Sequence, residues 1–343
     1  MDSFVIVIAV LAGVFTLYMG FVDGASAVAS CIATHAMKQK YAILMASLSM
    51  LVAPLVMCLL IKSDSVARTV GSLIDTVCYT SLDDKTGFIF LLSAMLAAGI
   101  WAIISTLLVV PNSASHTLLG GLVGAGIVVF GGQSIDWNSV GIKVVLMAFL
   151  APILGLIVGY SLQKLFYISF RGFPRKTKYG FRIMQRLNII LLSAAIAINN
   201  VQKSMGIYLI AMVIFKNQQF DAYQFSWWIV LIYSLLQSLG LFFGGEKLIN
   251  AVGNKIFRLS TVQSFVAQLS TIGIALASSF LGLPISTGQV VSSSIMGVGA
   301  ADKISSVRWL QAKRIFLSWI ITFPVSLGLG ALICFVLKLI VGV

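Results

Sequence analysis

One polar motif occurs twice in this apolar chain, 173 residues apart. The first copy runs from Pro111 to His116 and the second from Pro284 to Gln289, and each is followed by glycines or serines at matching spacings. A repeat of this length implies two structurally related halves. Proline- and glycine-interrupted segments at corresponding positions of two apolar halves are typical of a binding site near the middle of a membrane. The motif therefore predicts a site where the halves meet.

Composition indicates that the chain is an integral membrane protein. Hydrophobic residues make up 59% of the chain, charged residues only 10%, and the mean hydropathy is +1.04. Soluble domains are about one quarter charged. We expect an all-α polytopic membrane protein with ten crossings, whose first helix is retained rather than cleaved as a signal. Runs of spanning length include Tyr41–Ile61, Phe88–Val110, Val140–Leu162 and Ile315–Leu339.

The loop charges predict the orientation of the chain. Four segments hold 16 of the 23 Lys and Arg residues, and we assign them to the cytoplasm because cytoplasmic loops are rich in basic residues. Both termini then lie on the extracytoplasmic face of the membrane. The net charge of +13 reflects this topology and does not indicate nucleic-acid binding. The four segments are the turn at residues 38–40, Lys164–Arg186, Gly244–Ser260 and Asp302–Arg314.

The same assignment predicts three regions. Residues 1–163 form a first membrane repeat of about five crossings, residues 164–186 a basic cytoplasmic linker, and residues 187–343 a second repeat. Because the first repeat starts outside and the second inside, the two have inverted topology, with broken or re-entrant helices at the motifs. The linker carries seven basic residues and no acid, which also suits contact with membrane lipids.

Two charges fall within apolar stretches, Asp23 and Lys203. An offset of 177 residues aligns Asp23 with Asn200 and Ser26 with Lys203. Ionisable residues are costly inside a membrane, so a functional role is the default hypothesis. Asp23 is the only acid in an apolar span and can carry Na⁺ or a proton. We assign cation coupling to Asp23, Ser26, Asn199 and Asn200.

The repeated motif has the chemistry of an oxyanion site. Proline opens a helix and leaves N–H groups free at the start of the next one, where anions bind. Serine and threonine hydroxyls donate hydrogen bonds without carrying a charge. Such residues usually bond to their own helix and such glycines serve packing, but duplication at matching positions favours binding. We assign substrate binding to Ser113, Ser115, His116, Ser286, Thr287, Gln202, Lys203 and Ser204.

These motifs resemble those of the inorganic phosphate transporter (PiT) family. The likeness is carried by Pro111–Ala125, Ile198–Ile207 and Pro284–Ala301, and more weakly by Gly20–Ser30. It covers nearly the whole chain and resembles the compact prokaryotic members. The resemblance implies a secondary active transporter that imports inorganic phosphate by symport with H⁺ or Na⁺ and alternating access. The chain departs from the family pattern at Ser26, Asn200, Gln268, Gly288 and Gln289.

Other readings stay open from sequence. A sulfate or other tetrahedral oxyanion permease would share this fold, and a passive anion channel would share the site. A membrane phosphate-ester hydrolase needs a nucleophile with a base or a clustered metal site, which two histidines and one midplane carboxylate do not supply. We therefore predict no enzyme activity, no cofactor, no metal other than coupled Na⁺, and phosphate, a coupling cation and lipids as partners. A homodimer is left open.

Overall fold

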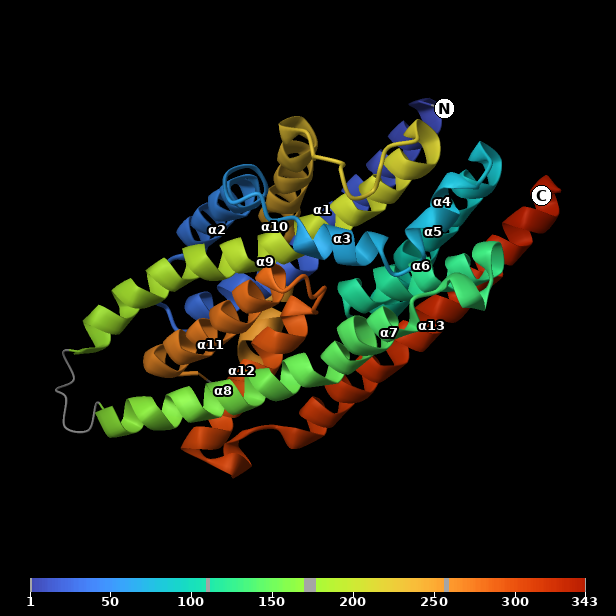
Figure 1. Ribbon diagram of the computed structural model, residues 1–343. Coiled ribbons are helices and arrows are strands. Elements are labelled where there is room, and N and C mark those ends of the chain that lie inside the picture. Colours follow the sequence, from blue (N-terminus) through green and yellow to red (C-terminus); the bar gives the residue numbers. More distant parts are fainter. Residues whose placement is uncertain (1, 109–111, 170–176, 256–258, 343) are drawn as a thin grey trace.

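The computed structural model describes residues 2–108, 112–169, 177–255 and 259–342 (Figure 1). These residues form helices and turns, and no β-strand occurs among them. Eight of the described helices are long and apolar enough to cross a membrane. The predicted all-α membrane architecture is therefore confirmed. Pro111 of the first motif and residues 170–176 of the predicted linker lie outside the described residues.

The first half begins and ends with long helices that enclose a short connector and a hairpin. Its main elements are α1 (Asp2–Ala33), α2 (Gln39–Leu55, continued by a π-helical turn at Val56–Leu60), α3 (Ser65–Gly71), α4 (Thr76–Thr80), α5 (Asp84–Leu107), α6 (Ala114–Phe130), α7 (Trp137–Ser139) and α8 (Met147–Ser169), with a π-helical stretch at Val140–Leu146 before α8.

The second half repeats this order without the short connector. Its main elements are α9 (Thr177–Lys216), α10 (Trp227–Lys255), α11 (Thr261–Phe280), α12 (Thr287–Asp302) and α13 (Trp309–Val341). Short 3₁₀ turns at Gly132–Ser134 and Ile304–Ser306 follow α6 and α12. Equivalent elements therefore occur in the same order in the two halves.

Side-chain caps explain where several of the helices begin. The Asp83 carboxylate accepts the backbone N–H of Thr86 at the start of α5, and Asp136 accepts that of Ser139 at the start of α7. These hydrogen bonds, from the side chain and backbone of Thr86 and Ser139, lower the pKa of both carboxyls. Ser260 starts α11 with a capping box.

Helices α5 and α6 form one hairpin, and α11 and α12 form another. In Figure 1 the first hairpin lies toward the end of the molecule that holds both termini, and the second toward the opposite end. Their tips meet, because the Ser115 hydroxyl donates to the Ile285 carbonyl at 2.9 Å. Helices α6 and α12 have 17 and 16 residues, or about 25 Å, less than the hydrocarbon thickness of a bilayer. Where ten crossings were predicted, the described residues contain eight helices long enough to cross a membrane, and α6 and α12 are too short to do so.

Each hairpin packs against the last helix of the other half. Helix α6 lies along α13, and α12 lies along α8. The approach is closest at glycines: a Cβ at Gly124 would lie 2.0 Å from the Leu327 carbonyl oxygen, and one at Gly297 would lie 2.1 Å from that of Leu156. No larger residue fits without moving backbone. The small residues after each motif therefore fix the hairpins against their partner helices.

The apolar core is divided in two at the level of the site. A first cluster holds α1 as far as Met19 and α9 from Val201 onward, together with the α5–α6 hairpin. A second cluster holds α1 from Ala25 and α9 as far as Ala197, together with α11 and α12. The break falls at the same level on both long helices, so a polar layer separates the two clusters.

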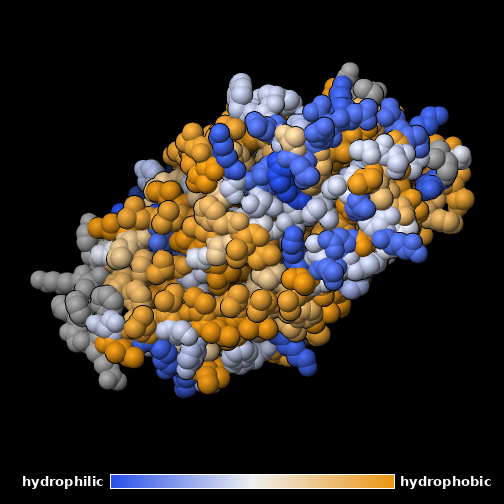
Figure 2. Space-filling view, viewed as in Figure 1, coloured by the Kyte–Doolittle hydropathy of each residue, from blue (hydrophilic) through white to orange (hydrophobic). Residues whose placement is uncertain are grey.

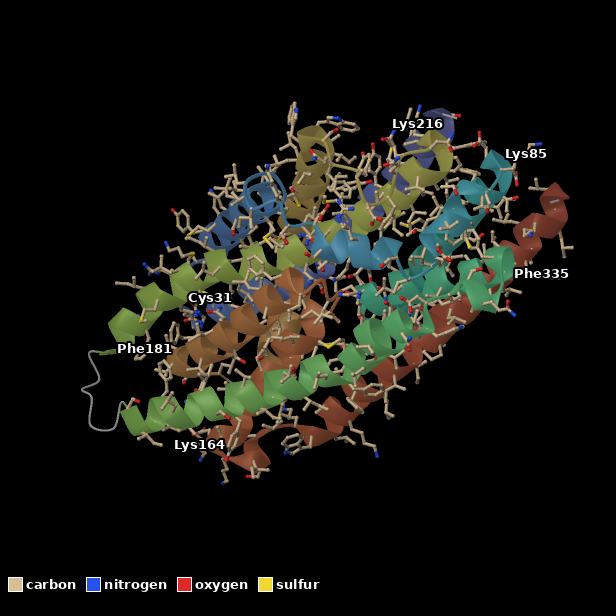
Figure 3. The ribbon with its side chains drawn as sticks, viewed as in Figure 1. Cys31, Lys85, Lys164, Phe181, Lys216 and Phe335 are labelled. Carbon is tan, nitrogen blue, oxygen red and sulfur yellow. The ribbon has the colours of Figure 1, made fainter. Side chains whose placement is uncertain are left out.

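The surface agrees with a protein embedded in a bilayer. Figure 2 shows a broad hydrophobic area across the middle of one face, with hydrophilic residues gathered at its upper right and lower edges. In Figure 3, Lys85 and Lys216 lie near the end that holds both termini, and Lys164 lies near the opposite end. Basic residues that the sequence assigns to opposite faces of the membrane thus occupy opposite ends of the molecule.

Candidate functional site

The polar layer between the two apolar clusters contains buried charged and polar side chains. Asp23 is 6% exposed, and Asn200 and Lys203 are fully buried. Helices α1 and α9 bring these three residues together, and the tips of the two hairpins close over them. Both mid-span charges predicted from the sequence therefore lie at one place.

Lys203 is the centre of the hydrogen-bond network. Its Nζ donates to the Ser115 hydroxyl at 2.6 Å, the Ile285 carbonyl at 2.8 Å and the Asn200 Oδ1 at 2.9 Å. All three donor positions of the ammonium are thereby used. Because Ser115 belongs to the first hairpin and Ile285 to the second, one side chain on α9 connects both hairpin tips.

Asp23 is connected to Lys203 through an amide. The Asn200 Nδ2 donates to the Asp23 Oδ2 at 2.8 Å, while the Asn200 Oδ1 accepts from Lys203. The other carboxylate oxygen, Oδ1, lies against the first turn of α12, where a Cβ at Gly288 would come within 3.2 Å of it. The Thr287 side chain also faces this carboxylate. Asp23 therefore sits at the N-terminus of α12, where the helix attracts negative charge.

The two copies of the motif start α6 and α12 in the same way. Ser113 and Ser286 are the N-cap residues, with backbone angles of −105°, 102° and −87°, 102°. Ser113 accepts the backbone N–H of His116, whereas Ser286 makes no side-chain cap bond. His116 and Gln289, at equivalent positions, contact each other through Nδ1 and Nε2 at 3.4 Å. The two helix starts therefore face each other.

Several polar atoms at this place have no partner within the described part of the chain. The Thr287 hydroxyl is fully buried and unpaired, and so are the Gln289 Oε1 and the Asn199 Oδ1. An unpaired buried polar atom costs free energy, which a bound solute recovers by completing its hydrogen bonds. Thr287 and Gln289 flank the first turn of α12, next to Asp23.

Other residues assigned to the site from sequence point elsewhere. Gln202 caps the short helix α3, accepting the Val66 N–H and donating to the Ser63 carbonyl. Ser204 accepts from Thr16 on α1 at 2.7 Å. Asn199 donates to Ser279 at 3.2 Å and to the Leu283 carbonyl at 3.1 Å, so it holds the second hairpin.

Ser26 is buried one turn beyond Asp23 on α1. Sequence reasoning missed the Ile285 carbonyl, which accepts from both Lys203 and Ser115. A backbone acceptor leaves no signal in a side-chain pattern. Tyr18 was also missed, because a residue five positions before Asp23 does not share its helical face. Its side chain faces Asn112, which follows the predicted Pro111.

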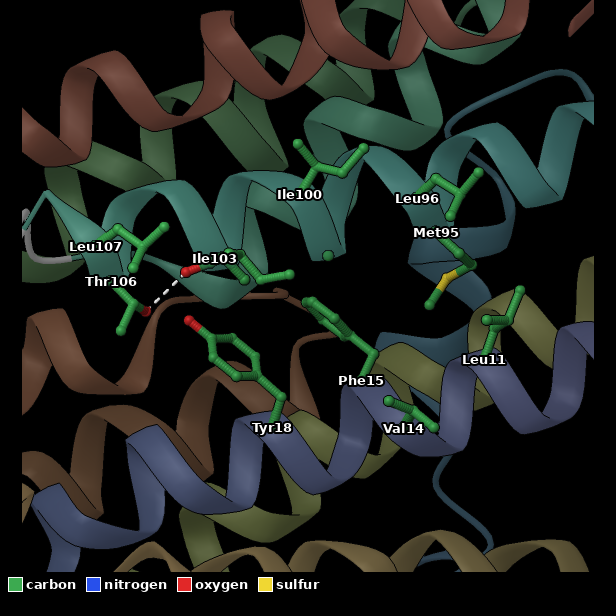
Figure 4. A pocket seen from close by; sticks show the side chains of 12 residues that line it. Leu11, Val14, Phe15, Tyr18, Met95, Leu96, Ile100, Ile103, Thr106 and Leu107 are labelled. Atoms are coloured by element: carbon green, nitrogen blue, oxygen red, sulfur yellow. Dashed lines mark hydrogen bonds between the residues drawn. The ribbon is translucent and has the colours of Figure 1, made fainter.

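An apolar groove of about 460 Å³ runs between α1 and α5 (Figure 4). Its lining includes Leu11, Phe15 and Ile100, and the Tyr18 ring stands at one end near Thr106. Leu107 and Ile103 are 76% and 62% exposed on the same side. The groove therefore faces the membrane, and Tyr18 separates it from the polar layer.

The site combines hydrogen-bond donors with one carboxylate. An ammonium, hydroxyls and two helix N-termini can bind an oxyanion. Within the described residues, no group of three His, Cys, Asp or Glu side chains could hold a metal ion. The arrangement suits reversible binding of a small anion.

Comparison with known proteins agrees with this chemistry. A relative from Bacillus subtilis, a "Probable low-affinity inorganic phosphate transporter", is 32% identical over 98% of this chain and 97% of its own length. A relative of the same description from Rhizobium meliloti is 30% identical over 95% of this chain and 94% of its own length. A solved structure, "The sodium-dependent phosphate transporter", shares the fold with a TM-score of 0.86 and 23% identity over 98% of this chain and 100% of that one.

These relatives are transporters, which confirms the prediction that the chain is not an enzyme. The model of the phosphate transporter family matches residues 19–330, a range that includes Asp23, Asn200, Lys203 and both copies of the repeated motif. On this match and on the relatives, the chain belongs to the phosphate transporter family.

Proposed function

We propose that this protein imports inorganic phosphate across the bacterial cytoplasmic membrane by symport with Na⁺ or H⁺. The observation that carries the proposal is the meeting of two hairpin tips on one buried ammonium, beside the unpaired Thr287 hydroxyl at the start of α12. A dehydrated oxyanion needs this combination of a counter-charge and fixed donors. The relatives named phosphate transporters, one of them sodium-dependent, support both the substrate and the coupling.

The proposed phosphate position lies between the starts of α6 and α12. Ser113, Ser115 and His116 would face it from the first hairpin, and Ser286 and Thr287 from the second, with Lys203 as the counter-charge. In the structure, the Lys203 ammonium uses the Ser115 hydroxyl and the Ile285 carbonyl as acceptors. Phosphate would replace these acceptors and join the two tips.

The cation would neutralise Asp23, with Ser26 and Asn200 beside it. Asn199 supports this position indirectly, because it holds the second hairpin and keeps one oxygen unpaired. We place the termini on the extracytoplasmic side, because the segments rich in Lys and Arg form the loops on the opposite side of the membrane in the predicted topology. The repeats 1–163 and 187–343 would then be inverted, joined by the linker 164–186.

Alternating access would use the two apolar clusters as gates. The side chains assigned to the site are at most 9% exposed, while Gly288 and Asn112 next to them are partly exposed. Opening the first cluster would connect the site to the outside, and opening the second would connect it to the cytoplasm. Because each hairpin packs against the last helix of the other half, movement of one half relative to the other would shift both hairpins.

Thr287→Val tests the proposal. The substitution keeps the side-chain shape and removes a hydroxyl that has no partner among the described residues. We expect uptake of radiolabelled phosphate into proteoliposomes to need about tenfold more phosphate for half-maximal rate, because a hydrogen bond to a charged group is worth about 1.5–3 kcal/mol.

Thr322→Val is the matched control, since the Thr322 hydroxyl donates to the Ser318 carbonyl of its own helix. This control should transport normally. Equal effects of the two valine variants would remove the reason for placing phosphate at α12. Uptake without any dependence on a Na⁺ or H⁺ gradient would replace the symporter with a passive anion channel.

A further inference from the structure

Asp23 places a carboxylate acceptor beside the hydrogen-bond donors of the site. Lys203, the Thr287 hydroxyl and the backbone N–H groups at the start of α12 all present hydrogens. Asp23 instead presents two carboxylate oxygens, of which Oδ2 accepts from Asn200 at 2.8 Å. Its Oδ1 faces the first turn of α12, where the Thr287 hydroxyl also points toward the carboxylate.

The position of this oxygen depends on a glycine. A Cβ at residue 288 would lie 3.2 Å from Oδ1, which is tighter than ordinary side-chain packing, so Gly288 leaves the carboxylate room against the helix start. The Oε1 of Gln289, 2% exposed and unpaired among the described residues, adds a second acceptor one residue further along. Any anion that binds to the first turn of α12 must therefore lie beside acceptor oxygens.

Tetrahedral oxyanions differ in their ability to satisfy such acceptors. Phosphate and arsenate carry one or two acidic protons near neutral pH, whereas sulfate carries none. A P–OH group can donate a hydrogen bond to a carboxylate. A sulfate oxygen facing the same carboxylate has no proton to donate, so two acceptors face each other and two negative charges repel. Sites built to hydrogen-bond a substrate hydroxyl reject analogues that lack it by large factors, because buried polar groups are left unpaired.

We propose that Asp23 is a specificity-determining residue, whose carboxylate accepts a hydrogen bond from a protonated tetrahedral oxyanion and so excludes sulfate. This inference rests on the proposed function, because it assumes that the oxyanion binds at the starts of α6 and α12. The charged and titratable groups that face Asp23 are Lys203 from α9 and Tyr18 from its own helix, and His116 from α6 faces Lys203. Among these, Asp23 alone presents a carboxylate.

The test is equilibrium binding of radiolabelled phosphate to the full-length protein in detergent at pH 7.5, with unlabelled competitors. For the wild type we expect arsenate to compete about as well as phosphate, and sulfate to compete at least about 100-fold less well. Asp23→Asn can turn its amide NH₂ toward sulfate and should narrow the phosphate-to-sulfate ratio at least about tenfold. Thr287→Val removes a donor that serves either anion and should weaken both without changing the ratio.

A wild-type measurement keeps the test independent of how Asp23→Asn folds. Monofluorophosphate has the charge and nearly the size of hydrogen phosphate but carries no proton at this pH, so it should compete as poorly as sulfate. Strong competition by monofluorophosphate or sulfate in the wild type would overturn the inference, and so would an unchanged ratio in a phosphate-binding Asp23→Asn protein. Absence of phosphate binding in the wild type, or normal binding in Thr287→Val, would instead refute the proposed function.

Discussion

Replacing Lys203 by methionine should destabilise the empty protein far more than a surface substitution would. Methionine matches the length of the lysine stem but has no donors. The Asn200 Oδ1, the Ser115 hydroxyl oxygen and the Ile285 carbonyl would each lose a hydrogen bond of 2.6–2.9 Å. Asp23 would also lose the positive charge that faces it through Asn200. Removing one member of a buried, hydrogen-bonded charge pair typically costs about 3–5 kcal/mol, and we expect a loss in this range.

The double variant tests whether the two charges act as a pair. Asp23→Asn alone should also destabilise the protein, because it leaves the ammonium buried without a counter-charge. Lys203→Met combined with Asp23→Asn removes both charges, so its loss should be smaller than the sum of the single losses by about 1–3 kcal/mol. The free energy of unfolding can be measured for the wild type and the three variants by denaturant titration in mixed detergent micelles.

Additive losses would refute the reasoning. A double loss within about 0.5 kcal/mol of the sum would mean that Asp23 and Lys203 do not interact across Asn200. Phosphate binding gives an independent check, because Lys203→Met should weaken it even where folding is retained. Normal phosphate affinity in that variant would remove Lys203 from the site.

Three further outcomes follow from the contacts. Asn200→Asp should place a second carboxylate about 2.8 Å from Asp23, so that the pair must take up an added cation or proton. Phosphate uptake should then depend more steeply on the Na⁺ or H⁺ concentration, and an unchanged dependence would contradict this. Gly124→Ala should lower the free energy of unfolding by about 1–3 kcal/mol, because its Cβ would meet an α13 carbonyl oxygen at 2.0 Å. Gly99→Ala, with open space around it, should not lower it, and equal free energies of unfolding for the two variants would contradict the packing. Arg68→Ala removes hydrogen bonds to three carbonyl groups of the loop after α9 and should speed hydrogen exchange in that loop; unchanged exchange would mean that the loop is held by other contacts.

The duplicated motif predicted more of the site than its surroundings did. Its spacing placed Ser113 and Ser286 at equivalent helix starts, and both are N-caps. The motif around Lys203 was less informative because consecutive residues of a helix point about 100° apart. Asn200 and Lys203, three residues apart, share a face and a hydrogen bond. Gln202 lies on another face and serves α3, an outcome that helical periodicity alone could have indicated.

The crossed packing of the hairpins could not be predicted from the sequence. Hydropathy reports which segments are apolar, but it carries no information about which apolar segments lie together. The short apolar segments that became α6 and α12 indicated hairpins. Their pairing with α13 and α8, however, depends on close contacts between backbone segments far apart in the chain. Glycines such as Gly297 permit these contacts and are otherwise indistinguishable from glycines that serve only local packing.

The difference between the two halves explains why a duplicated site would couple an anion to a cation. Strict repetition would place two acids, or two amines, at equivalent positions near one centre, where like charges oppose each other's ionisation. Here the first half supplies Asp23 and the second supplies Lys203, and the Asn200 amide connects them. The empty site is then balanced by one charge of each sign. An entering oxyanion adds negative charge, which Lys203 cannot compensate while it also balances Asp23. Neutralising Asp23 with Na⁺, with H⁺ or through the proton of the ligand itself therefore lowers the free energy of the anion-bound site. Under the proposed function, this charge balance favours symport over uniport.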